Sequence, residues 1–429
     1  MRIDVPWGTG IRTVEIDDER VAGILGAQVE SASNPEAILR EALRRPGAGF
    51  DDFLQKAPSP LLVVVNDGTR PTPSADVLQV MQDALEDWLD RPGRELWFAV
   101  ATGTHRVALP EEITRIFGAE MARKHRERIV SHDAKAEEEM VWLGRTSRGI
   151  DIKVNRLLAE AGSVILINSV EPHYFAGYTG GRKSLFPGLA AYETVWANHK
   201  LSMEAGSESL MLAGNPVHED MEEALAVGIA GKEVFSVQLV LDKDHRIGFA
   251  AAGPLDDTFR EAVRVADRQF VLDIDQRCDV VVAVAPHPMD CNLYQTNKAI
   301  QSGAAAVKDG GVLIVVSECP FGLGENQTLF DMLASVDSPR AAIERANREE
   351  YKLGVQQATR IASILERAEI WIVSTLDDDD VNAMFMTPFS DIQVALDRAL
   401  LHQGPEARVL FLQEASITVP RVEAHNRPG

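Results

Sequence analysis

Short apolar runs recur along the chain at lengths that suit buried strands of a parallel sheet. Runs rich in valine, leucine and isoleucine occupy residues 61–65, 96–100 and 164–167. Unbroken apolarity with β-branched side chains is typical of strands that are covered on both faces. Each run leads into a polar loop, and helices are predicted after the first two, over residues 74–90 and from about residue 111. Repeated strand–loop–helix units predict a parallel sheet whose polar residues gather at one edge.

A second set of elements extends this pattern to both ends of the chain. Alternating residues before position 20 predict a hairpin, and residues 34–45 predict a helix. Further strands are predicted over residues 234–241, 280–284, 312–316, 370–373 and 409–412, with a helix over 295–308. We expect an N-terminal α/β domain over residues 1–270 and a smaller C-terminal α/β domain over 271–429, with a soft boundary and a last segment that can return to the first domain. The expected fold class is α/β: two domains with mainly parallel sheets flanked by helices, and an active site in the interdomain cleft.

Composition and charge narrow the class of protein. The chain has 429 residues, of which 45% are apolar and 25% charged, as in globular proteins. Its 65 acidic and 43 basic residues give a net charge of -22, which argues against nucleic acid or an anionic membrane as a partner. There is no membrane-length apolar run and no secretion signal. The three cysteines lack C-x-x-C spacing and fit a reducing compartment, so we expect a cytoplasmic protein. The sequence does not indicate the oligomeric state.

The strongest candidate for chemistry is residues 171–188, a glycine-rich loop that follows the strand at 164–167. Glycines allow backbone to approach a ligand closely. The loop is not a P-loop, because Arg182 stands where that motif requires glycine before Lys183, and Pro187 would interrupt the helix that should follow. A loop that holds another anionic cofactor remains possible.

Histidines divide into two groups. The first is expected to be structural, on the surface or satisfied in the core: His125, His132, His218, His245, His287, His402 and His425. His105 and His173 instead follow predicted strands within Gly/Pro-rich loops, and an imidazole titrates near neutral pH, which suits proton transfer in both directions. His199 fits a metal ligand or a helix-terminal residue equally well on spacing alone.

Other polar positions allow two interpretations each. The guanidinium of Arg70 could bind a substrate carboxylate through two hydrogen bonds, or it could donate to carbonyls of its own loop. Gln295 and Lys298 lie three apart on one face of a predicted helix, where a solvated helix start is the simpler reading. The acidic run Asp377-Asp378-Asp379-Asp380 is expected to be a solvated turn.

Taken together, these motifs resemble the nickel-dependent lactate racemase family of 2-hydroxy acid racemases and epimerases. The matching segments are Asp67-Gly68-Thr69-Arg70-Pro71, Gly103-Thr104-His105-Arg106, Glu171-Pro172-His173, Gly180-Gly181-Arg182-Lys183-Ser184, Pro187-Gly188, Asn198-His199, Gly214-Asn215-Pro216-Val217-His218 and Tyr294-Gln295-Thr296-Asn297-Lys298. They occur in both expected domains. The chain departs from the family pattern at Asn66, where the family has a first aspartate, so the part played by Asn66 stays open.

The resemblance implies a cofactor and a role for each site residue. The cofactor is nickel held by a pincer nucleotide, pyridinium-3,5-bisthiocarboxylic acid mononucleotide, attached to Lys183, with His199 as the nickel ligand. His105 and His173 are implied to be the catalytic acid and base. Further implied contacts are Asp67, Thr69, Gly180 and Gly181 to the cofactor, and Arg70, Tyr294, Gln295 and Lys298 to the substrate. Cofactor-biosynthesis proteins are implied as partners, and the N-terminal domain is implied to carry the cofactor lysine and catalytic histidines.

The implied reaction inverts C2 of a 2-hydroxy acid by reversible hydride transfer through a 2-keto acid. His105 and His173 would exchange the roles of base and acid with direction, while Arg70 holds the carboxylate. Two alternatives stay open: a metal-assisted racemase that abstracts the C2 proton with Lys183, and a binding protein of the same fold without catalysis. No residue identifies the part of the substrate beyond C2.

Overall fold

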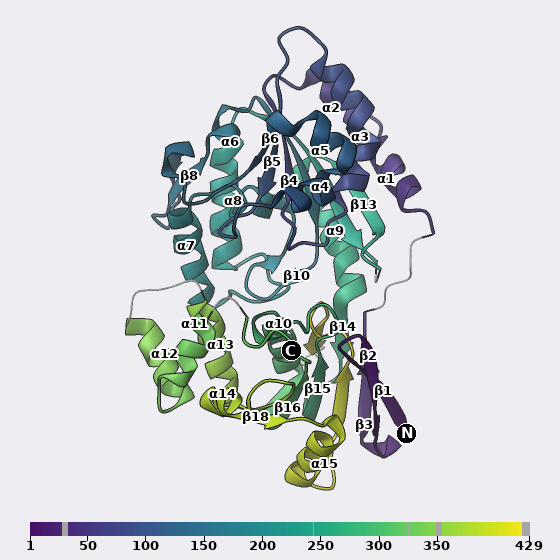
Figure 1. Ribbon diagram of the computed structural model, residues 1–429, viewed down its shortest axis with the longest axis vertical. Coiled ribbons are helices and arrows are strands. Elements are labelled where there is room, and N and C mark those ends of the chain that lie inside the picture. Colours follow the sequence, from purple (N-terminus) through teal and green to yellow (C-terminus); the bar gives the residue numbers. More distant parts are fainter. Residues whose placement is uncertain (28–32, 243, 325–326, 349–353, 423–429) are drawn as a thin grey trace, which may run out of the picture. The chain divides into compact units, whose positions relative to one another are not determined.

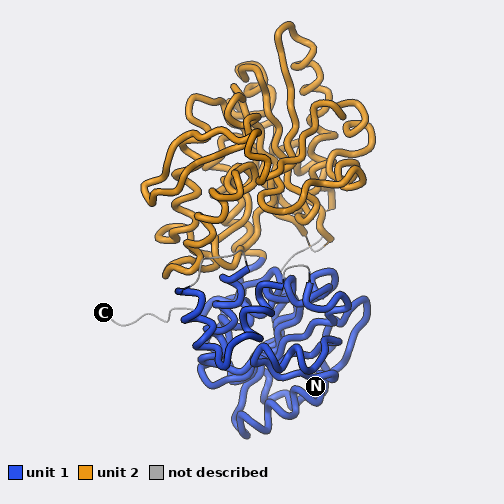
Figure 2. The backbone as a smooth tube through the Cα atoms, turned by 60° about the vertical axis from the view of Figure 1, so that its left-hand side comes forward, with its two compact units in different colours: residues 1–28, 270–429 blue, residues 29–269 orange. Residues whose placement is uncertain are grey.

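The computed structural model describes residues 1–27, 33–242, 244–324, 327–348 and 354–422 (Figure 1). The chain divides into two compact units (Figure 2). Unit 1 contains residues 1–28 and 270–429, and unit 2 contains residues 29–269. The N-terminal segment therefore packs with the C-terminal part of the chain, whereas the sequence analysis placed residues 1–270 in one domain. The reason is a strand pairing that the apolar pattern does not reveal, between β3 (Val21–Leu25) and β19 (Val409–Leu412).

Unit 2 is built on a six-stranded sheet in the order β13-β12-β9-β4-β5-β6. Its strands are β4 (Leu61–Asn66), β5 (Leu96–Ala101), β6 (Ile129–Ser131), β9 (Ser163–Ser169), β12 (Glu233–Leu241) and β13 (Ile247–Gly253). All neighbours are parallel except β12 and β13. The predicted strands of this half and the parallel sheet are thus confirmed, and the antiparallel edge is an addition.

Both faces of this sheet are covered, which explains the unbroken apolar runs. Val63 and Val65 point into one core and Leu62 and Val64 into the other. The first core is completed by α1 (Pro35–Leu43), α2 (Phe50–Lys56), α3 (Ser74–Leu89), α4 (Pro110–Phe117) and α5 (Ala119–Lys124). The second is completed by α6 (Arg156–Glu160), α7 (Tyr192–Lys200), α8 (Pro216–Gly228) and the antiparallel pair β7 (Met140–Arg145) and β8 (Asp151–Asn155). Helix α9 (Leu255–Phe270) follows β13.

Unit 1 contains a second six-stranded sheet in the order β18-β17-β16-β15-β19-β3, with every neighbour parallel. Its other strands are β15 (Cys278–Val284), β16 (Val307–Val316), β17 (Glu369–Val373) and β18 (Thr387–Phe389). The predicted N-terminal hairpin is confirmed as β1 (Arg2–Trp7) and β2 (Gly10–Glu15). It shares a core with α15 (Ile392–Gln403) and one face of the sheet.

The remaining elements of unit 1 are α10 (Leu293–Ala306), α11 (Thr328–Ala334), α12 (Pro339–Arg348), α13 (Val355–Leu365), α14 (Asp378–Ala383) and the parallel pair β14 (Val271–Ile274) and β20 (Val419–Val422). Short 3-10 turns lie at Asp18–Arg20, Arg126–Arg128, Glu137–Glu139, Gly181–Ser184 and Leu201–Met203. None of the helices in the described part of the chain has the length and apolarity that a membrane crossing requires.

The acidic run at residues 377–380 is largely exposed, as expected, but it forms the start of a helix and not a turn. Asp377 is the N-cap of α14, and its side chain accepts a hydrogen bond from the backbone N–H of Asp379 at 2.9 Å. Carboxylates are favourable at this position because they satisfy unpaired N–H groups and face the positive end of the helix dipole.

Candidate active site

The candidate residues of unit 2 lie at the carboxyl ends of three neighbouring parallel strands. Strand β4 lies between β9 and β5. From β4 the chain continues to β5 and β6 on one side of it, and the later strands β9 and β12 are added on its other side. The sheet order therefore reverses beside β4, and such a reversal leaves a crevice where ligands bind in open α/β sheets. Asp67 directly follows β4, His105 lies in the loop after β5, and His173 follows β9.

His105 is paired with a buried carboxylate. Its Nδ1 lies 2.7 Å from Oδ2 of Asp67, which is buried, while the imidazole is 49% exposed. The Thr69 hydroxyl donates to Oδ1 of the same carboxylate at 2.8 Å. A carboxylate accepts only, so the His105 Nδ1 carries a proton and its Nε2 offers a lone pair. Asp67 and Thr69, which the resemblance implied as cofactor contacts, thus also orient the candidate base.

His173 is held in the opposite tautomer. It lies in β10 (Pro172–His173), which pairs with β11 (Gly177–Tyr178) in a tight hairpin. The backbone N–H of Ala176 donates to its Nδ1 at 3.3 Å. A neutral ring that accepts at Nδ1 carries its proton on Nε2. The two candidate acid–base groups therefore present different functions, a lone pair on His105 and an N–H on His173.

Phe175 joins the candidate residues, and the sequence analysis missed it. The side chain is 3% exposed, and its ring lies edge-on to those of His173 and His199, with centroids 4.6 and 5.1 Å away. The Lys183 Nζ lies 5.7 Å from the same ring centroid. An aromatic residue between two glycine-rich segments was the available signal, but spacing in a loop does not reveal side-chain direction.

Lys183 lies in the 3-10 turn η4 (Gly181–Ser184) and is half-buried. The turn is entered through Gly180 and Gly181, whose φ angles are 76° and 55°. A Cβ on Gly180 would lie 2.8 Å from the Gln238 side chain, and one on Gly181 would lie 2.8 Å from the Phe259 ring. Protein atoms fill this space, so both glycines allow the close packing that presents Lys183.

The neighbouring Arg182 is fully buried and braces the same loop. Its Nη2 donates to the carbonyl of Ala176 at 2.7 Å, and its Nε lies 3.7 Å from Glu222. Burial lowers the pKa of Arg182 to about 10. His218 lies against the same Glu222, and burial, followed by the charge of Arg182, lowers its pKa to about 3. The structural interpretation of His218 stays a prediction, and His425 lies outside the described residues.

His199 lies in the last turn of α7 and carries a buried nitrogen. Its Nδ1 has no hydrogen-bond partner among the described residues. Burial, together with the charges of Lys183 and His105, lowers its pKa to about 3. The imidazole is therefore neutral at physiological pH, the form that binds metals. The helix is fixed on α8, because Asn198 donates to Asp220 at 2.8 Å.

This arrangement fits the metal cofactor that the resemblance implied. A neutral imidazole with an unpartnered buried nitrogen is a suitable nickel ligand beside soft sulfur donors, and a lysine amine suitable for attachment lies near the same phenylalanine. Within the described ranges, no group of three or more His, Cys, Asp and Glu side chains could hold a metal ion. His199 is thus a candidate as a single protein ligand.

Arg70, in the loop after β4, is paired with Glu171, which follows β9. The Arg70 Nη1 lies 3.8 Å from Oε1 of Glu171, and both side chains are about one-quarter exposed. The predicted fork for a carboxylate thus faces a carboxylate of the protein itself.

Three predicted substrate contacts belong to unit 1. Tyr294, Gln295 and Lys298 are half-buried on the first turns of α10, which follows β15. The N-cap Asn292 accepts a hydrogen bond from the Gln295 N–H at 3.0 Å. In unit 1 the order of strands reverses beside β15, so α10 begins at the position where the sheet of unit 1 would receive a ligand.

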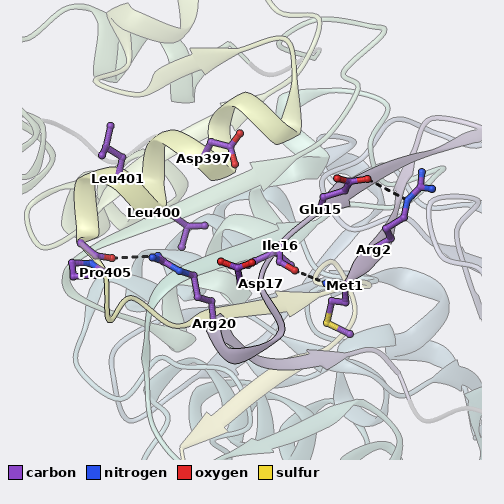
Figure 3. A pocket seen from close by; sticks show the side chains of 11 residues that line it. Met1, Arg2, Glu15, Ile16, Asp17, Arg20, Asp397, Leu400, Leu401 and Pro405 are labelled. Carbon is purple, nitrogen blue, oxygen red and sulfur yellow. Dashed lines mark hydrogen bonds and ion pairs between the residues drawn. The ribbon is translucent and has the colours of Figure 1, made fainter.

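Unit 1 also contains a groove of about 870 Å³ that is distant in sequence from all of these residues (Figure 3). It lies between the N-terminal hairpin and α15, and it is lined by both acidic and basic side chains, including Arg2, Arg20, Asp17 and Asp397. It contains none of the predicted site residues, so volume alone does not identify the site.

Comparisons with known proteins agree with this geometry. The lactate racemase N-terminal domain profile matches residues 7–211, and the lactate racemase C-terminal domain profile matches residues 274–419. The chain is 30% identical over 429 aligned residues to the lactate racemase of Lactiplantibacillus plantarum, covering 96% of this chain and 98% of that protein. It is 28% identical to the lactate racemase of Thermoanaerobacterium thermosaccharolyticum, covering 92% and 93%.

Solved structures show the same similarity. The lactate racemase apoprotein of Thermoanaerobacterium thermosaccharolyticum superposes with a TM-score of 0.89 at 27% identity, covering 98% of this chain and all of that one. A protein from Thermotoga maritima shares the fold with a TM-score of 0.67 at 18% identity, covering 92% of this chain and 100% of that one.

Proposed function

Because the chain belongs to the lactate racemase family, we propose that it is an isomerase that inverts C2 of a 2-hydroxy acid, with lactate as the first substrate to test. The observation that carries the proposal is the grouping of Phe175, His173, Lys183 and the unpartnered nitrogen of His199 at one sheet edge. His105 with its buried Asp67 supplies the second acid–base group there.

Lys183 and His199 are the residues that would hold the nickel-pincer nucleotide, by covalent attachment and by ligation. When bound, the group supplies reversible hydride transfer, so that the substrate passes through a planar 2-keto acid. The cofactor-biosynthesis proteins implied by the resemblance would be needed to supply it. Among the residues on α10, Tyr294, Gln295 and Lys298 are proposed to contact the substrate, and Gly180 and Gly181 the cofactor.

Arg70 is proposed to bind the substrate carboxylate. Because Glu171 occupies its guanidinium at 3.8 Å, the incoming carboxylate must compete with a protein carboxylate. Binding therefore exchanges one ion pair for another, and a planar, bidentate fork fixes the orientation of the acid group while C2 changes configuration.

His105 is proposed to accept the hydroxyl proton on its Nε2 lone pair. The imidazolium that forms is stabilised by the buried carboxylate of Asp67 at 2.7 Å. His173, in its protonated imidazolium form, returns a proton to the oxygen of the intermediate from its own position beside Phe175. In the opposite direction the two imidazoles exchange these roles.

The test follows the fate of the C2 hydrogen. Protein produced together with cofactor-biosynthesis proteins is given C2-deuterated L-lactate in water, and the D-lactate formed is analysed by mass spectrometry. The proposal expects racemisation with retained deuterium and a mass increase on Lys183. Complete loss of deuterium would instead support proton abstraction, and ligand binding without interconversion in fully loaded protein would support a binding protein. The control variant is His132→Gln, at a buried histidine outside the site, and it should give the same two results as the wild type.

A further inference from the structure

Asn66, the residue that departs from the family pattern, connects the strand ends at the point where the sheet order reverses. It is the last residue of β4, and its side chain lies between two hydroxyls, Ser184 Oγ at 2.9 Å and Thr72 Oγ1 at 2.8 Å. Thr72 Oγ1 in turn lies 2.8 Å from the hydroxyl of Ser169 at the end of β9. The chain of bonds thus links β4, its loop, β9 and the turn that carries Lys183.

The Ser184 hydroxyl has two acceptors but only one hydrogen. Besides Asn66, it contacts the side-chain oxygen of the buried Asn168. Asn168 directs its NH₂ to the carbonyl of Gly181 at 3.4 Å, so Asn168 presents oxygen to Ser184. The Asn66 NH₂ donates to Thr72 Oγ1, while its carbonyl oxygen accepts from the Ser184 hydroxyl. The amide of Asn66 is therefore needed as a donor and an acceptor at the same time.

We propose that Asn66 is a positioning residue that fixes the Lys183 turn on the sheet through Ser184. An aspartate at this position accepts from both sides and donates to neither, so the hydrogen bond to Thr72 Oγ1 loses its donor. The importance of this turn for cofactor attachment rests on the proposed function, whereas the hydrogen-bond network itself does not.

The test measures hydrogen exchange in the apoprotein, before any cofactor is involved. The reporters are the amides of Lys183, Leu185, Phe186 and Gly188, which bond to carbonyls in the same turn at 2.8–3.1 Å. Asn66→Ala and Asn66→Asp are expected to speed their exchange at least about tenfold, because opening of the turn becomes easier. Asn34→Asp makes the same chemical change at the N-cap of α1, where aspartate caps equally well, and is expected to leave these amides unchanged.

The amide exchange rates of the two variants should respond differently to a fall in pH. As pH falls, the aspartate of N66D gains a proton and can donate again, so its exchange, corrected for intrinsic rate, should return toward wild type. N66A should stay fast at every pH. Wild-type exchange of these amides in both variants overturns the proposal. If neither variant folds, Thr72→Val removes the other end of the network with little change of shape, and unchanged exchange there overturns the proposal in the same way.

A second readout connects the network to attachment. When supplied with cofactor, N66A is expected to show a several-fold smaller fraction of Lys183 modified than wild type, by intact mass. Equal modification overturns the functional part of the proposal. A wild-type chain that never gains mass on Lys183 instead contradicts the proposed function, while the exchange result in apoprotein still decides the role of Asn66.

Discussion

At the scale of single residues, the two candidate acid–base histidines differ in which nitrogen carries the proton. Asp67 fixes the proton of His105 on Nδ1, and the backbone N–H of Ala176 leaves the proton of His173 on Nε2. In the state described, His105 can accept a proton at Nε2, whereas His173 offers an N–H for hydrogen bonding and must take up a proton before it can act as an acid. Each direction of turnover needs one ring neutral and the other protonated, and reversing the direction exchanges these two states.

Asp67→Asn should test this assignment. An asparagine oxygen can still accept from the His105 Nδ1–H, but it lacks the charge that stabilises the imidazolium. We expect kcat to fall on the order of 100-fold, with the mass on Lys183 unchanged. Steady-state kinetics on loaded protein measures the effect, and Asp76→Asn on α3 is the control for charge removal. An unchanged kcat would show that His105 does not gain a proton in the reaction.

His199 should make the apoprotein sensitive to acid. Its folded pKa of about 3 lies below the ordinary histidine value of 6.5, so the unfolded chain binds the proton first as pH falls. Stability is then lost progressively below about pH 6.5, and His199→Gln should remove roughly 1.4 kcal/mol of that loss at pH 5.5. Thermal unfolding of the wild type and the variant at pH 7.5 and 5.5 measures the difference. If the difference in stability between the wild type and the variant is the same at both pH values, the prediction is contradicted.

At the scale of elements, the turn η4 depends on how closely its backbone packs. Gly180 and Gly181 combine positive φ angles with protein atoms where a side chain would lie, so the turn is fixed by contact as well as by conformation. Arg182 adds a bond from the same turn to the β10–β11 hairpin. Lys183 and Phe175 are therefore held by one packed unit, although they come from separate loops.

Matched glycine substitutions separate contact from conformation. Gly231 has a φ of 73°, and no atom of the described residues lies within 4 Å of its missing Cβ. Gly231→Ala should therefore cost about 1–2 kcal/mol of stability through backbone strain alone. Gly181→Ala adds a clash with Phe259, and its cost should be larger by about 1–3 kcal/mol. Denaturant unfolding of both variants gives the comparison, and equal losses would mean that Phe259 moves aside freely.

At the scale of the whole molecule, elements determined by neighbouring residues could be predicted from the sequence, whereas pairings between distant segments could not. Strands such as β4 and β9 were predictable because burial on both faces leaves an apolar run within the strand itself. The pairing of β3 with β19 joins residues nearly 400 positions apart, and no local pattern encodes it. The acidic start of α14 was missed because aspartates suit a solvated turn and a helix N-terminus alike.

The candidate site divides in the same way. His105, His173 and Lys183 were predictable because their residue types and glycine-rich loops indicate chemistry. The central position of Phe175 and the two tautomers depend on side-chain direction and on contacts between loops. Asn66 is the intermediate case: its departure from the family pattern was visible, but its two partners were not.

Metal binding should be separable from covalent attachment in the complete protein. We expect one nickel per loaded chain, together with the mass increase on Lys183. His199→Gln should keep that mass increase but lose nickel to a chelator that leaves the wild type intact, because only the imidazole ligand is removed. Elemental analysis and intact mass on the same samples provide both readouts. Retained nickel in the variant would assign the ligand to another residue.

The pairing of β3 with β19 also determines the order in which the two units can form during synthesis. Residues 29–269 make up unit 2 without interruption, so its parallel sheet can assemble as soon as that stretch has left the ribosome. The edge strand β3 of unit 1 precedes unit 2 in the chain, whereas its neighbour β19 follows unit 2. The part of the chain that carries Lys183 and the histidines can therefore fold before β3 pairs with β19.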